Sequence, residues 1–395
     1  MLNKSISINQ FLLGIFFLIW ATNAYVLFGS IGKYASLLLG ILFLMKSLIK
    51  EKLDPSTSFL IIKGVLVYIL FIFVGIEMNQ KTITSTIVIF GLICMVLFFL
   101  GGLLRVNFVE DKENNKRIVV LISTLVLLGS IKLYGLQSLI SSNKTRGLGD
   151  STLNAVGVAY IYGQLFILLF WFFVRERRLW LKIFLTLALV SIVGILFITQ
   201  SRGALLFLVI TLLFAYKKHM RFLFSQRNIM MLFLIVLIVF FLFKGNSLIQ
   251  EKIDLVIQRF DGAINYLSKG KNDGSLEERK GIIRLFINNY DQMFLGQYGY
   301  EPYPHNQFLE IFMRWGIFGI PIIIISLISI FKAFKFFKLE HRNYKTINYL
   351  IVSIFFFSYL QSMSSLSLEM NRFMWFGFGF LIKDYYLKSK KLTNI

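Results

Sequence analysis

Long apolar runs, separated by short connections rich in Lys and Arg, are the feature that most constrains how this chain can fold. A backbone inside lipid has no water to bond with, so a spanning segment must be a helix or part of a closed barrel. A helix of roughly 17–25 residues crosses the hydrocarbon core, and by this measure we predict about twelve spans. The predicted spans are residues 11–29, 34–50, 59–77, 83–104, 118–139, 153–174, 183–199, 202–216, 229–245, 306–331, 347–365 and 370–387.

The low content of charged residues favours the same fold class. Charged residues are 16% of the 395 residues, against about 25% in soluble domains. Because no long polar block lies outside the loops, we predict an all-α polytopic membrane protein with a single transmembrane domain over residues 1–395. The single cysteine, Cys94, lies in an apolar run, which leaves no disulfide and no Cys-based metal site within the chain.

The positive net charge of +22 has a simple interpretation in a membrane protein. Lys and Arg collect in the cytoplasmic loops, so the charge gives no reason to expect a nucleic-acid partner. The basic connections are residues 46–52, 105–117, 175–182, 217–227, 332–345 and 383–391. The alternate connections 30–33, 78–82 and 362–372 carry one basic residue each. This alternation predicts cytoplasmic termini, an uncleaved first helix and one large extracytoplasmic loop over residues 246–305.

Two amphipathic helices are predicted within this outer loop. In residues 247–268 the apolar positions recur at steps of three and four, so we expect a helix lying on the membrane surface or against the bundle. A second helix is predicted to start at Ser275, because Ser275 and Glu278 have the spacing of a capping box. Gly296 is a plausible stop signal for it.

The second helix places one of its two arginines on the apolar side. Its predicted apolar stripe consists of Ile282, Ile283, Phe286, Tyr290 and Met293. Arg279 continues this stripe, whereas Arg284 shares its face with polar residues and is expected to be solvated. The structural alternative for Arg279 is a side chain whose apolar stem snorkels at the end of the stripe.

Several polar residues stand at span ends or inside a span. Arg202 opens one span, and His305 and Asn306 mark the start of another. Asn306, Glu310 and Arg314 follow at steps of four, so they form a polar stripe on one apolar helix. Polar and charged residues within spans face the protein interior and are candidates for function, so we predict that Asn306, Glu310 and Arg314 bind substrate. The alternatives are an interfacial Arg202 bonded to carbonyls, a structural His305, and a Glu310–Arg314 ion pair that serves packing alone.

The outer-side cations indicate the class of ligand. Arg202, Arg279 and His305 come from distant positions, and all three are predicted on the outer side. Arginines without a cage of carboxylates favour an anionic, phosphate-bearing ligand. No paired Asp motif and no His-rich motif occurs in the outer segments, so we expect a metal-independent site without a cofactor.

Three further residues are weaker candidates for binding substrate. Arg146 opens a small Gly-rich outer loop that is too generic to name a ligand. Tyr298 and Tyr300 flank the turn before His305, and their rings are able to stack on a sugar. A belt of Tyr at the membrane interface is the structural alternative for both.

The motifs together resemble a known family. Ser201-Arg202-Gly203-Ala204 opens a span, Arg279 is followed by Gly296 and Gly299, and Pro304-His305-Asn306 is followed by Glu310, Gly316 and Gly319. In their order, side and spacing these residues resemble the O-antigen polymerase and O-antigen ligase superfamily of bacterial envelope glycosyltransferases. The likeness runs from Ser201 to about Pro321; Arg146 to Asn154 fits a further family feature, and the first spans match only in hydropathy.

The resemblance implies a metal-independent, inverting transfer of a glycan from undecaprenyl pyrophosphate on the outer face of the bacterial inner membrane. By this likeness Arg202 and Arg279 hold the pyrophosphate, and His305 orients or deprotonates the acceptor hydroxyl. A chain-length regulator protein is a further implied partner, beside the lipid bilayer and the lipid-linked glycan.

The resemblance implies one of two acceptors. It is another lipid-linked repeat in a polymerase of O-antigen or capsular polysaccharide, and lipid A-core in a ligase. The short stretch from Arg279 to His305, and Ile283 near the place of a Trp common in the family, favour polymerase over ligase. A lipid-linked oligosaccharide flippase or another transporter is the alternative from a different class, although neither an internal repeat nor a broken midplane helix is evident.

Overall fold

The computed structural model describes residues 85–103, 155–199, 201–217, 274–294, 304–339, 346–364 and 371–392, together with Leu368 and scattered positions elsewhere. Every regular element in this part of the chain is helical, and none is a strand. The chain divides into two compact units. The first unit comprises Met1–Phe108, Glu278–Lys338 and Ser358–Ile395, and the second comprises Val109–Glu277 and Leu339–Phe357.

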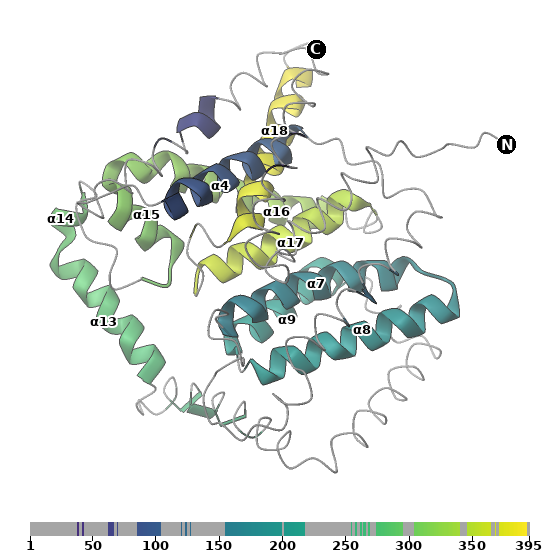
Figure 1. Ribbon diagram of the computed structural model, residues 1–395. Helices are drawn as coiled ribbons and strands as arrows, with labels where there is room; N and C mark the ends of the chain where they lie inside the picture. The colour runs from purple at the N-terminus through teal and green to yellow at the C-terminus, as the bar shows by residue number, and fades with distance from the viewer. Residues whose placement is uncertain are drawn as a thin grey trace. The chain divides into compact units, whose positions relative to one another are not determined.

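The second unit is built on three helices that follow one another in the chain. They are α7 (Ala155–Arg175), α8 (Leu179–Ile198) and α9 (Arg202–Tyr216), and both α8 and α9 contact α7 (Figure 1). The α7–α8 connection is held by Glu176, whose Oε1 accepts from the N–H groups of Arg177 and Arg178 at 2.8 Å each. This short polar turn interrupts two apolar helices that would otherwise merge.

Helix α17 (Ile347–Ser362) supplies its first part to the second unit. Gly163 of α7 lies so close to the Phe357 ring that any side chain at position 163 would collide with it. The Tyr349 hydroxyl donates to the carbonyl oxygen of Ala215 at the end of α9. Small residues and interhelical hydrogen bonds of this kind are how helices associate in membranes.

In the first unit, α4 (Ser85–Leu103) packs against α18 (Arg372–Leu392). Gly101 lies against the backbone of Phe376, and Gly379 lies against the backbone of Phe98. Because a Cβ at either glycine would collide with a carbonyl oxygen, only glycine permits this approach. Helix α16 (Ile320–Leu339) is tied to α18 by Lys332, whose Nζ donates to the Leu381 carbonyl oxygen at 2.8 Å.

The predicted span over residues 306–331 lies within a stretch long and apolar enough to cross a membrane, but it is not one continuous helix. Helix α15 (Gln307–Trp315) ends at Gly316, the 3-10 turn η4 (Gly316–Gly319) follows, and α16 then begins. Gly316 has φ 52° and ψ −134°, a combination that is open to glycine and sterically closed to other residues. A Cβ at Gly319 would lie 2.5 Å from Ile311 Cγ2, so the second glycine permits η4 to fold back on α15.

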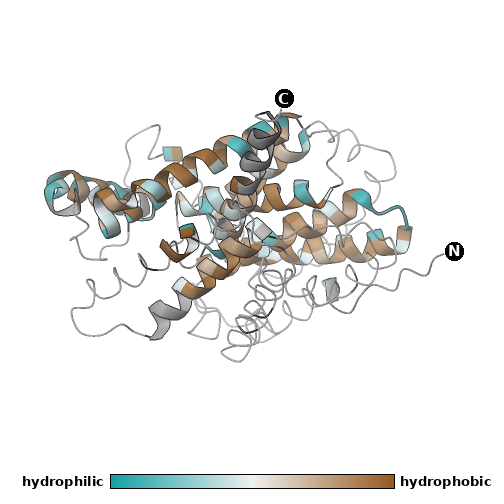
Figure 2. Cartoon of the chain, turned by 90° about the horizontal axis from the view of Figure 1, so that it is seen from above, coloured by the Kyte–Doolittle hydropathy of each residue, from teal (hydrophilic) through white to brown (hydrophobic). Residues whose placement is uncertain are grey.

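Among the described residues, three stretches are long and apolar enough to cross a membrane. They are Val156–Arg175, Leu179–Phe197 and the interrupted stretch Gln307–Leu339. Apolar residues run along the long helices, and hydrophilic ones lie mainly at their ends and connections (Figure 2). The shorter apolar helices Gly91–Gly102, Arg202–Tyr216, Ile347–Ser362 and Arg372–Ile382 coincide with four further predicted spans.

The remaining predicted spans lie wholly or mostly outside the described residues. They are 11–29, 34–50, 59–77, 118–139 and 229–245. Most of the predicted surface helix over residues 247–268 also lies outside them. The second predicted outer helix is present as α13 (Gly274–Asn288), followed by the short helix α14 (Tyr290–Phe294).

Candidate functional site

His305 stands in a strained turn directly before α15. Its φ is 52°, and it is the one non-glycine residue with positive φ among the described residues. The left-handed region is unfavourable for residues with a Cβ, and such strain gathers at functional sites. The side chain is half-buried, so the imidazole has both a protein side and an accessible side.

Asn306 fixes the start of α15 immediately after His305. Its Oδ1 accepts from the N–H groups of Phe308 at 3.0 Å and Leu309 at 3.2 Å. This is an N-cap, which satisfies two of the N–H groups that a helix start leaves open. The amide oxygen of Asn306 therefore has a structural task, although the residue also remains a candidate for substrate binding.

Gln307 joins the start of α15 to two other helices. It is fully buried, its Nε2 donates to Ser326 Oγ on α16 at 2.9 Å, and its Oε1 accepts from Ser362 Oγ on α17 at 2.8 Å. Each hydrogen bond between these buried groups fixes α15 laterally. The sequence analysis did not single out Gln307, although it lies between the capping Asn306 and the polar Glu310.

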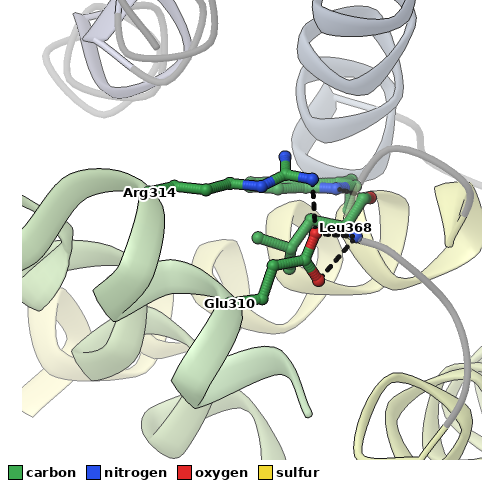
Figure 3. A network of polar contacts seen from close by, with 4 residues as sticks. Glu310, Arg314 and Leu368 are labelled. Carbon is green, nitrogen blue, oxygen red and sulfur yellow. Dashed lines mark hydrogen bonds and ion pairs between the residues drawn. The ribbon is translucent and has the colours of Figure 1, made fainter. Parts of the chain in front are cut away.

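Glu310 and Arg314 form a buried ion pair one helical turn further along α15. Arg314 Nη2 lies 2.6 Å from Glu310 Oε1, and the two residues are 5% and 1% exposed respectively. Both carboxylate oxygens of Glu310 also accept from the Leu368 N–H at 3.2 Å (Figure 3). Trp375 Nε1 on α18 donates to the Leu368 carbonyl oxygen at 2.8 Å. The polar face of α15, defined here as Gln307, Glu310 and Arg314, thus holds the connection between α17 and α18.

The start of α18 adds an arginine that the sequence analysis did not name as a site residue. Arg372 is only 2% exposed, and it is the single basic residue of the connection 362–372. The preceding Asn371 donates from Nδ2 to the Ser358 carbonyl oxygen on α17. An Arg next to an Asn at the head of an apolar span was the available sequence signal, since charges within spans are costly unless they have a role.

Arg279 is half-buried and Arg284 is exposed, and the facing of Arg279 towards the membrane domain stays a prediction. Ile282 is buried, and the Phe286 ring meets the Phe312 ring of α15 edge-on, with centroids 5.8 Å apart. The predicted stripe was too wide, because Ile283 and Tyr290 are exposed. Only residues in line with Ile282 and Phe286 turn towards α15.

Arg202 is the first residue of α9 and is half-buried. Ser201 stands at the N-cap but makes no side-chain capping bond, while its carbonyl oxygen accepts from the Leu205 N–H at 3.2 Å. A guanidinium beside helix N–H groups favours an anion. Arg202 belongs to the second unit, whereas Arg279 and His305 belong to the first. The meeting of the three therefore stays a prediction.

The remaining predicted site residues, Arg146, Tyr298 and Tyr300, lie outside the described residues. Within the described ranges, no group of three or more His, Cys, Asp or Glu side chains is placed to hold a metal ion. Arg279 on α13 and His305 before α15 both belong to the first unit, in which the two helices meet at the Phe286 and Phe312 rings. A base or hydrogen-bonding group together with a cation would suit a reaction in which negative charge develops on a leaving group, and the approach of these two residues stays a prediction.

The chain was also compared with known proteins. No protein-family model matches it, and no protein of established function matches it.

Proposed function

We propose that this protein is a membrane glycosyltransferase that polymerises O-antigen or capsular polysaccharide. It joins oligosaccharide repeat units carried on undecaprenyl pyrophosphate, at the outer face of the bacterial inner membrane. The observation that carries the proposal is the strained His305, held directly before a capped helix whose buried polar face is fixed to three neighbouring segments. Backbone strain of this kind persists only where the surroundings enforce it, and it is a reason to infer function.

The proposed reaction is an inverting displacement at the anomeric carbon of the donor sugar. His305 accepts the proton of the acceptor hydroxyl as its oxygen attacks this carbon from the face opposite the leaving group. The bond from the carbon to the pyrophosphate oxygen breaks, and undecaprenyl pyrophosphate leaves with the electron pair. No metal or cofactor takes part in the proposed step.

The arginines would stabilise the charge that develops on the leaving group. Arg279 is half-buried on α13, and Arg202 is half-buried at the start of α9. Donors aimed at developing charge are typically worth about 2.7–4 kcal/mol each. Arg146, Tyr298 and Tyr300 remain proposed contacts to the glycan. Glu310 and Arg314 are reassigned from substrate contacts to positioning residues, because their charged groups already bind each other and the Leu368 N–H.

The proposed topology has both termini in the cytoplasm and the site on the outer side. The support for it is the alternation of basic and weakly charged connections. The apolar helices Val156–Arg175, Leu179–Phe197 and Gln307–Leu339 support membrane insertion. A membrane-embedded enzyme would meet its lipid-linked donor and acceptor in the same bilayer, and a chain-length regulator protein would be a partner there.

The decisive test uses the purified protein in liposomes with lipid-linked repeat units, both with and without lipid A-core. Longer glycans on undecaprenyl pyrophosphate would support polymerase. Transfer to lipid A-core would identify a ligase instead, and movement across the bilayer without new bonds would identify a flippase. The matched control is His305→Ala. This variant should insert normally, and the glycans in its reaction should stay at the length of the starting repeat units.

A further inference from the structure

Helices α13 and α14 carry a stripe of exposed apolar side chains. Ile283 is 47% exposed, Ile287 61%, Tyr290 67% and Phe294 49%. The steps between them are four, three and four residues, so at about 100° per residue they project within an arc of about 60°. The stripe continues across the α13–α14 junction, because the Asn289 N–H bonds to the carbonyl oxygens of Leu285 at 3.2 Å and Phe286 at 3.3 Å.

Charged residues border this stripe on one side, namely Lys280 and Arg284 on α13 and the exposed Asp291 on α14. Lys280 and Arg284 are both exposed, and they project about 50–90° from the centre of the stripe. The other border is Arg279, after which the face with Ile282 and Phe286 begins. Around α13 there are therefore a side with Ile282 and Phe286, which meets α15 at the Phe312 ring, an exposed apolar stripe, and a charged edge.

A stripe of large apolar side chains is unfavourable in water, so it requires a cover. Helix α13 does not itself cross the bilayer, because its 15 residues include Glu277, Glu278, Arg279, Lys280 and Arg284. Apolar residues beside a charged edge are the pattern of a helix lying in the plane of a membrane interface.

The neighbouring elements identify the bilayer as the cover. Helix α14 contacts η4, where Ile317 and Phe318 are exposed, and the exposed apolar surface continues onto α16 at Ile320 and Ile324. Helix α16 belongs to the stretch Gln307–Leu339, which is apolar and long enough to cross the membrane. Exposed apolar residues thus lie on α14, on the η4 turn that α14 contacts, and on the span α16 that follows η4.

We propose that α13 and α14 lie in the outer interface of the bilayer. Ile283, Ile287, Tyr290 and Phe294 enter the boundary of the acyl chains, and Lys280 and Arg284 meet the phosphates of anionic lipid headgroups. This goes beyond the proposed function and does not depend on it, since an interfacial helix requires no reaction.

The test measures the surroundings of single nitroxide labels on the full-length protein in phosphatidylglycerol-rich nanodiscs. Cys94, which is buried in α4, is replaced by Ala so that only an introduced Cys reacts. Labels at Ile287 and Phe294 should show high collision with oxygen and low collision with a water-soluble nickel complex. Labels at Gly281 and Asn288 should show the reverse. Both control positions are exposed, and a Cβ at Gly281 meets nothing within 4 Å.

Two results would overturn the proposal. Nickel access at Ile287 equal to that at Asn288 would place the stripe in water. Low access for both reagents at Ile287 would place it against protein, such as a second copy of the chain. A charge test completes the design: Lys280→Glu with Arg284→Glu should move the Ile287 label towards water, and an unchanged signal would exclude the headgroup contact. No substrate is present, so the outcome is independent of the proposed glycosyl transfer.

Discussion

The buried pair Glu310–Arg314 provides the sharpest test of how α15 is held. Glu310→Gln removes the negative charge while leaving a side-chain oxygen that can still accept from the Leu368 N–H. Arg314 then stays buried with its charge uncompensated, since it is only 5% exposed. Breaking a buried pair from one side costs about 3–5 kcal/mol of unfolding free energy. Arg314→Met should cost a similar amount, because it isolates the Glu310 carboxylate.

The double variant Glu310→Gln with Arg314→Met removes both charges and keeps the acceptor for Leu368. Replacing both members of a buried pair is often neutral or even stabilising. We therefore expect the double variant to recover most of the stability that either single variant loses. The measurement is the unfolding midpoint of the purified protein in detergent, followed by its intrinsic tryptophan fluorescence, to which the buried Trp315 and Trp375 contribute.

A double variant as unstable as the sum of the two single variants would refute this reasoning. The pair would then not be coupled, and its burial on α15 would be wrong. Glycan transfer by the double variant is a second measurement, and the recovered stability of this variant means that a change in transfer is not caused by unfolding. If the polar face of α15 positions His305, the double variant should keep the KM of the wild type and show a modest fall in kcat.

The other predictions concern the strained turn, the glycine break and the two arginines. His305→Gly relieves the positive φ and should be about 0.5–1 kcal/mol more stable than His305→Ala, while both lose glycan transfer; equal midpoints would argue against strain. Gly316→Ala should lower the unfolding free energy by about 1–3 kcal/mol because of its φ and ψ, as measured by the same midpoint. Arg279→Ala should abolish glycan transfer at a normal protein level, whereas Arg284→Ala should keep most of the transfer. Equal turnover of lipid-linked repeats by the two variants would contradict the prediction that Arg279, and not Arg284, faces the protein. Arg202→Lys should fold normally but lose at least about 10²-fold in turnover, since Lys lacks a bidentate donor pair; near wild-type turnover would return Arg202 to an interfacial anchor.

The sequence predicted the helical class and the facing of Arg279 because both follow from local periodicity. Apolar runs of spanning length define helices wherever they occur. On α13 the steps from Arg279 to Ile282 and Phe286 predict that all three lie on one side; Ile282 is buried, and Arg279 and Phe286 are half-buried. Ile283 and Tyr290 were placed wrongly, since hydropathy alone does not separate a face against protein from a face against lipid.

The break between α15 and α16 and the role of Gln307 could not be predicted from hydropathy. Gly316 lies within an apolar stretch, where an isolated glycine is compatible with a continuous helix. Its unusual φ and ψ follow from tertiary packing, because Gly319 must approach Ile311. The partners of Gln307, Ser326 and Ser362, lie 19 and 55 residues away, and no periodic pattern connects such positions. The hydrogen-bond partners of a buried polar side chain depend on which helices are neighbours in the bundle. A single sequence does not show which helices are neighbours.

The division of α13 into faces offers a reason why Arg279 rather than Arg284 would act in the proposed reaction. The pyrophosphate of a lipid-linked donor stays at headgroup depth, because its undecaprenyl tail remains in the acyl chains. A cation that binds it must stand between the lipid and the protein. Arg279 lies between the exposed apolar stripe and the face with Ile282 and Phe286, whereas Arg284 lies on the far edge of the stripe. A pyrophosphate entering from the bilayer would therefore meet Arg279 on its way to the side of α13 that packs on α15, the helix that follows His305.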